Sequence, residues 1–294
     1  MKVLTNTRAS NEKDMVVYFD SNDYDREWHK TTNIPMQMQI DEWRNLLKTF
    51  SNSDVMYYPH DWETAYKTEE IRNINIKFKN NRHIIFHAFS WRYVDIIDNL
   101  QLLKTQGFTH IMVAPVQGTK SGNEWWEFFQ PLKIGFVDNP RGTKKEFKEL
   151  CEKANEIGIY IGVDIVLRHV ADSCNDRMKL HEKVDKSLEK YVLWDKLKCE
   201  NYKNRWDYTN LRLDAPMMNI WDREYQDICI NFIKELRMLG VKFLRLDQLK
   251  HYPVSSEGCD FLKNVFEQFE KDMLIFGEVI YCPVWENDLY INNY

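Results

Sequence analysis

Short apolar runs alternate with amphipathic stretches along most of the chain from residue 83 onward. The apolar runs lie at 83–91, 109–115, 159–166, 241–247 and 273–280. The amphipathic stretches lie at 93–107, 143–158, 222–240 and 259–272. In the first of these stretches, Ile96, Leu100 and Leu103 share one face of a helix with about 3.6 residues per turn. The pattern therefore predicts repeated strand–helix units.

The residues at the ends of the predicted helices agree with this pattern. Thr143 followed by Glu146 predicts a capping box at a helix start, and Gly158 and Gly240 stand where helices must end. The predicted strands are nearly continuous apolar runs, which is typical of a parallel sheet buried on both faces. Repeated units of this kind form an open doubly wound sheet or a closed barrel. No glycine-rich phosphate loop follows a strand, which argues against a nucleotide-binding open sheet.

Acidic residues gather at the ends of three successive predicted strands. Asp164, Asp247 and Glu278 stand there, and Arg245 precedes Asp247 by two positions. In a barrel these strand ends form one face, which is where catalysis takes place. Two carboxyl groups can act as nucleophile and proton donor, as in most glycosidases. An arginine beside the attacking carboxylate would keep it ionised.

Composition limits the other possibilities. A chain of 294 residues fits one α/β barrel, and a net charge of -5 gives no reason to expect nucleic acid or a membrane surface as a partner. No apolar stretch approaches the length of about 20 residues that a membrane-spanning helix needs. The polar start lacks the apolar core of a signal peptide, so we expect a cytoplasmic protein. The scattered cysteines are expected to be free thiols.

Five segments, in the right order, resemble the α-amylases, the (β/α)8-barrel glycoside hydrolases that act on α-linked glucans. SGNEWWEFFQPLKI resembles the WWxxYQPxxY segment of the family, and LRLDAPMMN resembles its LPDLN region. GIYIGVDIVLRH resembles the strand with the DxVxNH motif, GVKFLRLDQLKH resembles GFRxDxxKH, and FGEV resembles the GE motif. The resemblance implies a TIM-type barrel that cleaves α-1,4-glucan bonds, as in starch or glycogen, with retention of configuration.

The resemblance also implies catalytic roles for the acids. Asp247 would be the nucleophile and Glu278 the general acid/base. Arg245 would orient Asp247 and keep it charged, and Asp164 would hold Arg245.

The same resemblance implies residues that bind a polysaccharide or oligosaccharide substrate. His169 would bind the sugar in the central subsite, and Lys250 and His251 would line the subsites on the product side. Trp126 and Phe129 would offer aromatic faces on which sugar rings stack.

The third carboxylate of the family lies well beyond the GE motif, whereas this chain ends 16 residues after Glu278. The segment VVYFDSNDYDRE (16–27) resembles the missing motif, FVDNHDNQR, with Asn22 and Asp23 at the corresponding positions. The segment at 39–59 then resembles the helix and eighth strand of the family. We therefore expect a circularly permuted barrel in which Asp23 is the third catalytic carboxylate and Asn22 binds substrate.

This interpretation predicts a single catalytic barrel domain over 1–294. Residues 1–82 would supply strands seven and eight and a connector, 83–169 and 209–294 the barrel core, and 170–208 a small insertion after strand three. The sixth unit would be abbreviated, with 2–5 or 288–292 as its strand. Strand 15–19 would lie two places beyond strand 273–280, with 54–58 beside 83–90. The alternative is a truncated barrel with 1–82 as an unrelated α+β segment.

The calcium site that the resemblance implies is altered. Arg168 stands in place of the Asn of DxVxNH, and Met217 in place of the Asp of LPDLN. Calcium prefers several oxygen ligands, so we expect no bound metal and no cofactor. Arg168 would supply the positive charge itself, paired with Asp172 or Asp207, or would face solvent. These departures keep open a second function, a catalytically inactive glucan-binding or structural relative of the α-amylases.

Overall fold

The structure is a computed structural model that describes residues 2–5, 16–20, 83–89, 91–173, 176–279 and 289–290. Within these residues, no helix is long and apolar enough to cross a membrane.

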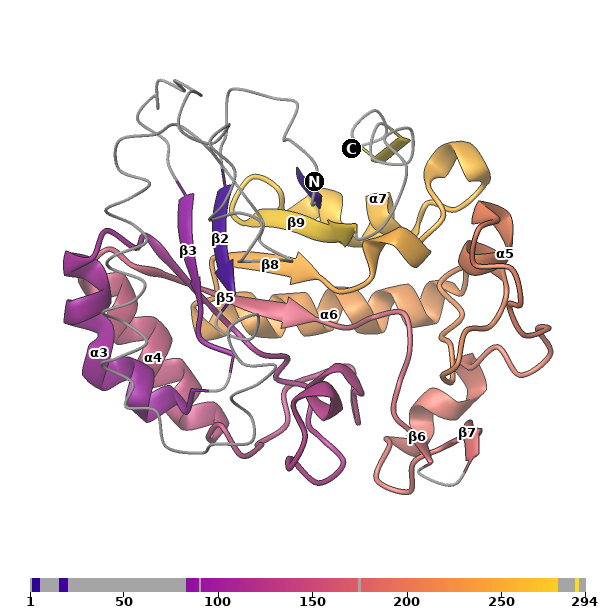
Figure 1. The fold of residues 1–294 in the computed structure, drawn as a ribbon, viewed down its shortest axis with the longest axis horizontal. Helices are drawn as coiled ribbons and strands as arrows, with labels where there is room; N and C mark the ends of the chain where they lie inside the picture. The colour runs from indigo at the N-terminus through magenta and orange to yellow at the C-terminus, as the bar shows by residue number, and fades with distance from the viewer. Residues whose placement is uncertain are drawn as a thin grey trace, which may run out of the picture.

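One parallel sheet forms the centre of the molecule (Figure 1). Its strand order is β1-β9-β8-β5-β4-β3-β2, and each neighbouring pair is parallel. The strands are β1 (Lys2–Thr5), β2 (Val16–Asp20), β3 (His83–His87), β4 (His110–Val113), β5 (Tyr160–Ile165), β8 (Phe243–Leu246) and β9 (Leu274–Val279). From β3 to β9 the order in space follows the order in the chain, as in a half-barrel. These five parallel strands confirm the predicted strand–helix repeat.

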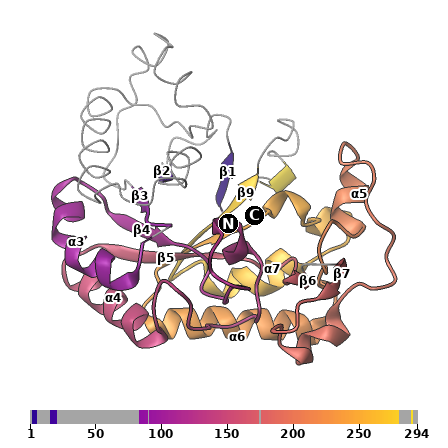
Figure 2. The ribbon, with the colours of Figure 1, turned by 60° about the horizontal axis from the view of Figure 1, so that its bottom comes forward.

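Helices connect these strands and cover the outer face of the sheet (Figure 2). They are α3 (Tyr93–Thr105), α4 (Lys144–Glu156), α6 (Arg223–Leu239) and α7 (Phe261–Phe266). The predicted capping box is confirmed, since Thr143 accepts from the Glu146 N–H and the Glu146 side chain accepts from the Thr143 N–H. Gly240 ends α6 with a φ of 102°, a conformation that glycine adopts at little cost.

Further elements lie between β5 and β8. A small antiparallel pair, β6 (Asp172–Ser173) and β7 (Asp176–Leu180), is followed by the 3₁₀ helix η4 (Lys186–Tyr191) and by α5 (Arg205–Asn210). Shorter 3₁₀ helices are η3 (Trp125–Phe129), η5 (Leu249–His251), η6 (Ser255–Glu257) and η7 (Glu267–Phe269). Two of these, η3 and η5, lie in the segments that follow β4 and β8, and they carry residues of the candidate site.

The two faces of the sheet have different cores. Residues of the outer face, such as Phe86 and Ile161, pack with the apolar faces of the helices in one large buried cluster. On the inner face Ile85, Met112, Phe243 and Phe276 form a separate buried cluster. Side chains alternate along a strand, so a residue two positions after a member of this cluster lies on the same inner face. His87, Arg245 and Glu278 stand at such positions, after Ile85, Phe243 and Phe276.

The N-terminal strands test part of the predicted permutation. β1 pairs with β9 at the place expected for the sixth strand, with 2–5 as one of the two candidates. The expectation that 54–58 lies beside 83–90 is wrong, because β4 takes one edge of β3 and β2 the other. Residues 54–58, 288 and 291–292 lie outside the described residues, and 289–290 are helical, so the described part of the other candidate, 288–292, is not a strand. Circular permutation and an abbreviated sixth unit therefore stay predictions.

A glycine on the inner face of β5 makes room for an aromatic ring. A Cβ added to Gly162 would overlap the ring of Phe243, the residue opposite it on β8. We expect Gly162→Ala to lower the free energy of unfolding by about 1–3 kcal/mol through overpacking. Urea unfolding measures this loss.

The matched control is Gly135→Ala, whose Cβ would meet only the flexible side chain of Lys133. Since the clash of Gly162→Ala is with the Phe243 ring, its cost should be smaller in a Phe243→Leu background. Equal losses from Gly162→Ala and Gly135→Ala would contradict this account of the inner cluster.

Candidate active site

The sheet register brings three charged residues together on its inner face. Asp164 on β5 lies directly opposite Arg245 on β8, and Arg245 lies opposite Phe276 on β9. Glu278 follows Phe276 by two residues and so points to the same face. All three lie at the C-terminal ends of their strands, just above the inner apolar cluster.

Arg245 bridges the two acids. Its Nη1 donates to Asp164 Oδ2 at 2.5 Å, and its Nη2 donates to Glu278 Oε1. The three side chains are 7%, 0% and 17% exposed, in the order Arg245, Asp164 and Glu278. A bridge this well buried is sensitive to loss of either partner, because the remaining charge would be uncompensated. The expectation that Asp164 holds Arg245 is confirmed.

Asp247 lies directly after β8, and its N–H donates to the Ile165 carbonyl at 2.9 Å. Burial raises the pKa of its carboxyl well above the usual range, and the charges of Glu278 and Asp164 raise it further. The charge of Arg245 acts in the opposite direction and lowers the pKa. Burial beside two other acids therefore favours the protonated form of Asp247.

The charge of Arg245 acts on Asp247 in the direction that was expected, since it lowers the pKa, but burial and two acidic neighbours raise the pKa more. The role of Arg245 toward Asp247 stays a prediction.

Asp164 has a raised pKa of about 6 because it is completely buried. The charges of Arg245 and His87 lower this pKa, and the charge of Glu278 raises it. His87 ends β3 and is buried on the inner face. Sequence reasoning missed His87, although a polar residue that interrupts the apolar run HIIFHAF is a usable signal.

Glu278 receives a second donor from an unusual backbone. Gln248 has a φ of 53° and is the one described non-glycine residue with positive φ. Its N–H donates to Glu278 Oε2 at 3.2 Å. Residues held in this left-handed conformation cost free energy and cluster at functional sites. No local sequence signal pointed to Gln248.

The predicted sugar-binding histidines are both neutral. His169 Nε2 donates to the Phe129 carbonyl at 2.7 Å, and His251 Nδ1 donates to the Tyr208 carbonyl at 3.2 Å. Burial lowers the pKa of each ring to about 4. Lys250 Nζ lies over the Tyr208 ring, 5.1 Å from its centroid. Tyr208 thus contacts both Lys250 and His251. Sequence reasoning missed this residue.

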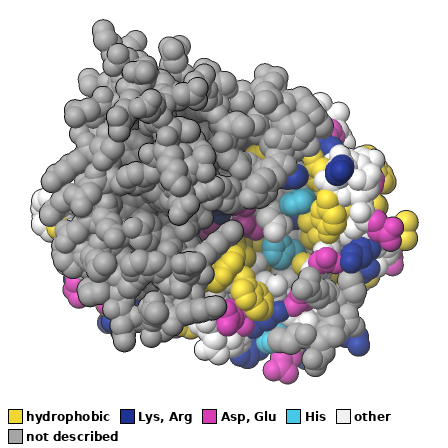
Figure 3. Space-filling model, viewed as in Figure 1, with side chains coloured by type: hydrophobic (Ala, Val, Ile, Leu, Met, Phe, Trp, Pro, Cys, Tyr) yellow, Lys and Arg dark blue, Asp and Glu magenta, His cyan; other side chains and the backbone are white. Residues whose placement is uncertain are grey.

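The aromatic residues predicted to bind sugar lie on η3. Phe129 stacks on Phe89 with ring centroids 5.6 Å apart and an interplanar angle of 15°. Trp125 and Trp126 are 44% and 40% exposed, so each offers part of a ring face to a ligand. Lys120 Nζ lies 5.4 Å from the centroid of the Trp126 ring. In Figure 3 acidic, histidine and hydrophobic side chains appear side by side on one face of the molecule.

The structure contradicts two of the expectations for Arg168, that it faces solvent and that it pairs with Asp172. It is buried rather than solvent-facing, and its guanidinium donates to the carbonyl oxygens of Thr209, Met218 and His251. Asp172 pairs with Lys120 instead.

The residues present do not fit a calcium site of the kind that the family resemblance implies. A guanidinium and the thioether of Met217 stand where that resemblance places two oxygen ligands, and hard cations prefer oxygen. Across the described ranges, no group of three or more His, Cys, Asp or Glu residues is arranged to hold a metal ion.

Asn22 and Asp23 lie outside the described residues. Their roles in catalysis and substrate binding stay predictions.

Comparisons with known proteins point to one family. Residues 93–228 match the family model "Alpha amylase, catalytic domain". The alpha-amylase of Clostridium acetobutylicum is 29% identical over 211 residues, which cover 67% of this chain and 28% of that protein. The alpha-amylase of Aeromonas hydrophila is 25% identical over 228 residues, which cover 67% of this chain and 48% of that protein. The chain is similar to the alpha-amylases over about two thirds of its length, and the match spans less than half the length of either relative.

Solved structures support the fold. A variant of alpha-amylase I from Eisenia fetida, in complex with maltohexaose, has a TM-score of 0.59 and 21% identity. The match covers 70% of this chain and 47% of that one. An alpha-amylase from Geobacillus thermoleovorans, complexed with acarbose, has a TM-score of 0.51 at 20% identity over 64% of this chain and 40% of that one. At these identities the likeness concerns the barrel fold alone.

Arg168 and Met217 lead to a prediction about calcium. Thermal unfolding in excess chelator and in added calcium should give the same midpoint, because a positive charge and a thioether disfavour a hard cation. Magnesium serves as the control cation. A midpoint that falls by several degrees in chelator, and that calcium but not magnesium restores, would contradict the prediction.

Proposed function

We propose that this protein is a glycoside hydrolase of the alpha-amylase type, which cleaves α-1,4-glucan bonds with retention of configuration. The observation that carries the proposal is the group of acids at the C-terminal ends of the parallel strands, where Arg245 bridges Asp164 and Glu278 and Asp247 follows directly after β8. In this role Asp247 attacks the anomeric carbon and Glu278 protonates the leaving oxygen. Glu278 then acts as a base toward the water that releases the product.

The neighbourhood of the two carboxyl groups supports retention. Retaining glycosidases hold these groups about 5–5.5 Å apart, and inverting ones about 6.5–9.5 Å apart to admit a water molecule. The charge of Glu278 raises the pKa of Asp247, and Glu278 bonds to Arg245 two residues before Asp247, so the two acids are near neighbours, which suits the closer arrangement.

The first chemical step requires a change of protonation. Burial and the neighbouring acids favour a protonated Asp247 in the free site, but Asp247 must be ionised to attack carbon, and Glu278 must be protonated to donate. In the proposed mechanism a proton therefore moves from Asp247 to its neighbour Glu278 when substrate binds. Arg245 is close enough to stabilise the resulting Asp247 carboxylate, because its charge already lowers the pKa of that group.

The surrounding residues suit a chain of sugar rings. His169, Lys250 and His251 would donate hydrogen bonds to hydroxyl groups, and Trp126 and Phe129 would stack on sugar faces. The two histidines are uncharged near neutral pH, since their pKa values lie at about 4, so they suit a neutral ligand. The complex of the Eisenia fetida relative with maltohexaose supports a linear α-glucan, as in starch or glycogen, as the substrate.

The catalytic pair gives the direct test. We expect Asp247→Asn and Glu278→Gln each to lower turnover of soluble starch at least about a thousandfold, equivalent to roughly 4 kcal/mol of transition-state stabilisation. A reducing-sugar assay measures turnover, and NMR of the first product should show the α-anomer.

The control for this test is Asp272→Asn, an exposed acid paired with Arg237 on the outer face, which should retain full activity. Product of the β configuration would refute the mechanism. A parent protein that binds oligosaccharide without turning it over would instead indicate the inactive glucan-binding relative.

The third carboxylate gives a separate prediction. Asp23→Ala should lower turnover at least about a hundredfold, several kcal/mol at about 1.4 per decade. The unfolding midpoint should stay nearly unchanged, because the role of Asp23 is to bind sugar hydroxyls in the transition state. Asp20→Ala and Asp25→Ala are the matched controls and should cost much less. Turnover of Asp23→Ala equal to that of the parent would remove Asp23 from the site.

A further inference from the structure

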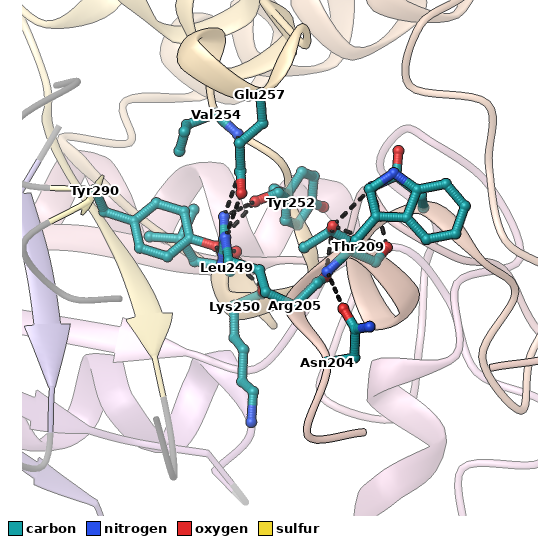
Figure 4. A network of polar contacts seen from close by, with 11 residues as sticks. Asn204, Arg205, Thr209, Leu249, Lys250, Tyr252, Val254, Glu257 and Tyr290 are labelled. Atoms are coloured by element: carbon teal, nitrogen blue, oxygen red, sulfur yellow. Dashed lines mark hydrogen bonds and ion pairs between the residues drawn. The ribbon is translucent and has the colours of Figure 1, made fainter. Parts of the chain in front are cut away.

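The backbone carbonyl groups of residues 249–252, shortly after Asp247, are all contacted by side chains from distant parts of the chain. We call residues 249–252 the pinned segment. The Tyr290 hydroxyl lies 2.8 Å, 3.0 Å and 2.9 Å from the carbonyl oxygens of its first, second and fourth residues (Figure 4). The hydroxyl has a single proton, so it donates to one of these three carbonyl oxygens at a time. Tyr290 therefore holds the segment from the C-terminal part of the chain.

Arg205 supports the same segment from α5. It forms a two-point ion pair with Glu257, at 2.6 Å and 2.7 Å, which fixes the plane of its guanidinium. The same group donates to the Tyr252 carbonyl at 3.2 Å and to the Tyr290 hydroxyl at 3.1 Å. Figure 4 shows Arg205 between Glu257 and Tyr290. Arg205 thereby connects Tyr252, at the end of the pinned segment, to α5, which lies between β5 and β8 in the chain.

Arg168 holds the remaining carbonyl of the segment and is unlike Arg205 in one respect. Its Nε donates to the His251 carbonyl at 3.3 Å, its Nη1 to Met218 at 2.6 Å and its Nη2 to Thr209 at 2.9 Å. The guanidinium also lies 5.5 Å from the ring centroid of Trp221. Neither these contacts nor the groups that shift its pKa include a carboxylate among the described residues.

A buried cation without an acid needs several neutral acceptors. Arg168 is 0% exposed, and an isolated charge at such a depth is costly unless it is well hydrogen-bonded. Arginine stays protonated in this setting, and its planar fork matches carbonyl groups that come from three directions. Three backbone oxygens around one positive charge resemble the surroundings of a bound cation. Arg168 and Met217 occupy the two positions where the family resemblance placed oxygen ligands of calcium.

The pinned segment controls parts of the catalytic site on both sides. At its start, Gln248 keeps a left-handed conformation with its N–H directed at Glu278. Within it, Lys250 and His251 both contact Tyr208. On β9, Gly277 leaves room for the Leu249 side chain, which a Cβ would overlap. Loss of the carbonyl contacts would therefore release both the Gln248 N–H and the two predicted sugar-binding side chains.

We propose that Arg168 is a positioning residue whose guanidinium serves as a fixed internal cation. It holds the pinned segment so that Gln248 donates to Glu278 and Lys250 and His251 face the substrate. The side chain thus does the work that a bound metal ion would do at this place. The effect on catalysis rests on the proposed function, whereas the effect on the backbone does not.

The first test measures the backbone. Arg168→Met removes the charge and the donors but keeps much of the volume. Amide hydrogen exchange of His251 and Tyr252, whose N–H groups bond to the Gln248 and Leu249 carbonyls, should become at least about tenfold faster in this variant, as expected for a local opening. Amides of β4, which lies two places away from β8 in the sheet, should change less.

Arg168→Lys and Arg237→Met are the companion variants. Lysine keeps the charge but reaches fewer carbonyls, so exchange and activity should be intermediate and the protein should fold even if Arg168→Met does not. Arg237 is an exposed residue of α6 paired with Asp272, and its variant should match the parent. Exchange at His251 and Tyr252 equal to that of the parent, in a folded Arg168→Met or Arg168→Lys protein, would overturn the proposal.

Kinetics complete the test if the parent cleaves starch. Arg168→Met should lower kcat about tenfold or more, because Gln248 loses its contact with Glu278. It should also raise KM for maltohexaose, as Lys250 and His251 become less ordered. A variant that unfolds at a lower temperature but keeps the kcat and KM of the parent would show a purely structural role and overturn the proposal. An inactive parent would refute the proposed function and leave the exchange test valid.

Discussion

The bridge from Arg245 to Asp164 and Glu278 is the interaction on which the rest of the site depends. It links β5, β8 and β9, and it forms because the parallel register places Asp164 directly opposite Arg245. A slip of one residue would turn each of these side chains toward the helices. The register therefore matters for function. The alternation that buries Phe243 and Phe276 on the inner face also places the charged residues two positions later on that face.

Burial gives these charges their chemistry. A carboxyl group in water is ionised at neutral pH, but burial beside two other acids raises the pKa of Asp247 well above its usual range. Arg245 compensates part of the negative charge, and the dry apolar cluster beneath prevents water from screening the rest. The arrangement costs stability, because buried charges lose hydration that their partners do not fully replace. A loss of stability of this kind is expected where buried acids take part in catalysis, as the proposed function requires.

Local patterns in the sequence predicted the strands, the main helices, the capping box at Thr143 and the acids at the strand ends. These features depend on residues close together in the chain. The surroundings of Arg168, the role of Tyr208 and the left-handed Gln248 depend on contacts between distant segments, and no periodicity encodes them. The expectation that 54–58 lies beside 83–90 failed for the same reason, since strand neighbours follow from long-range pairing and the structure places β2 beside β3. The charge state of Asp247 could not be predicted without its burial.

A side chain and a metal ion solve the same problem differently. Either one brings together carbonyl groups that would repel each other, and in this protein those groups come from α5, from Met218 and from the segment after Asp247. A metal ion adjusts its ligand geometry and depends on the concentration of free metal. A guanidinium is covalently attached to β5 through Val166 and Leu167, so its position follows the same strand that carries Asp164. The cation that holds the segment after Asp247 and the acid that holds Arg245 are thus placed by one strand, which couples the geometry of the site to the register of the sheet.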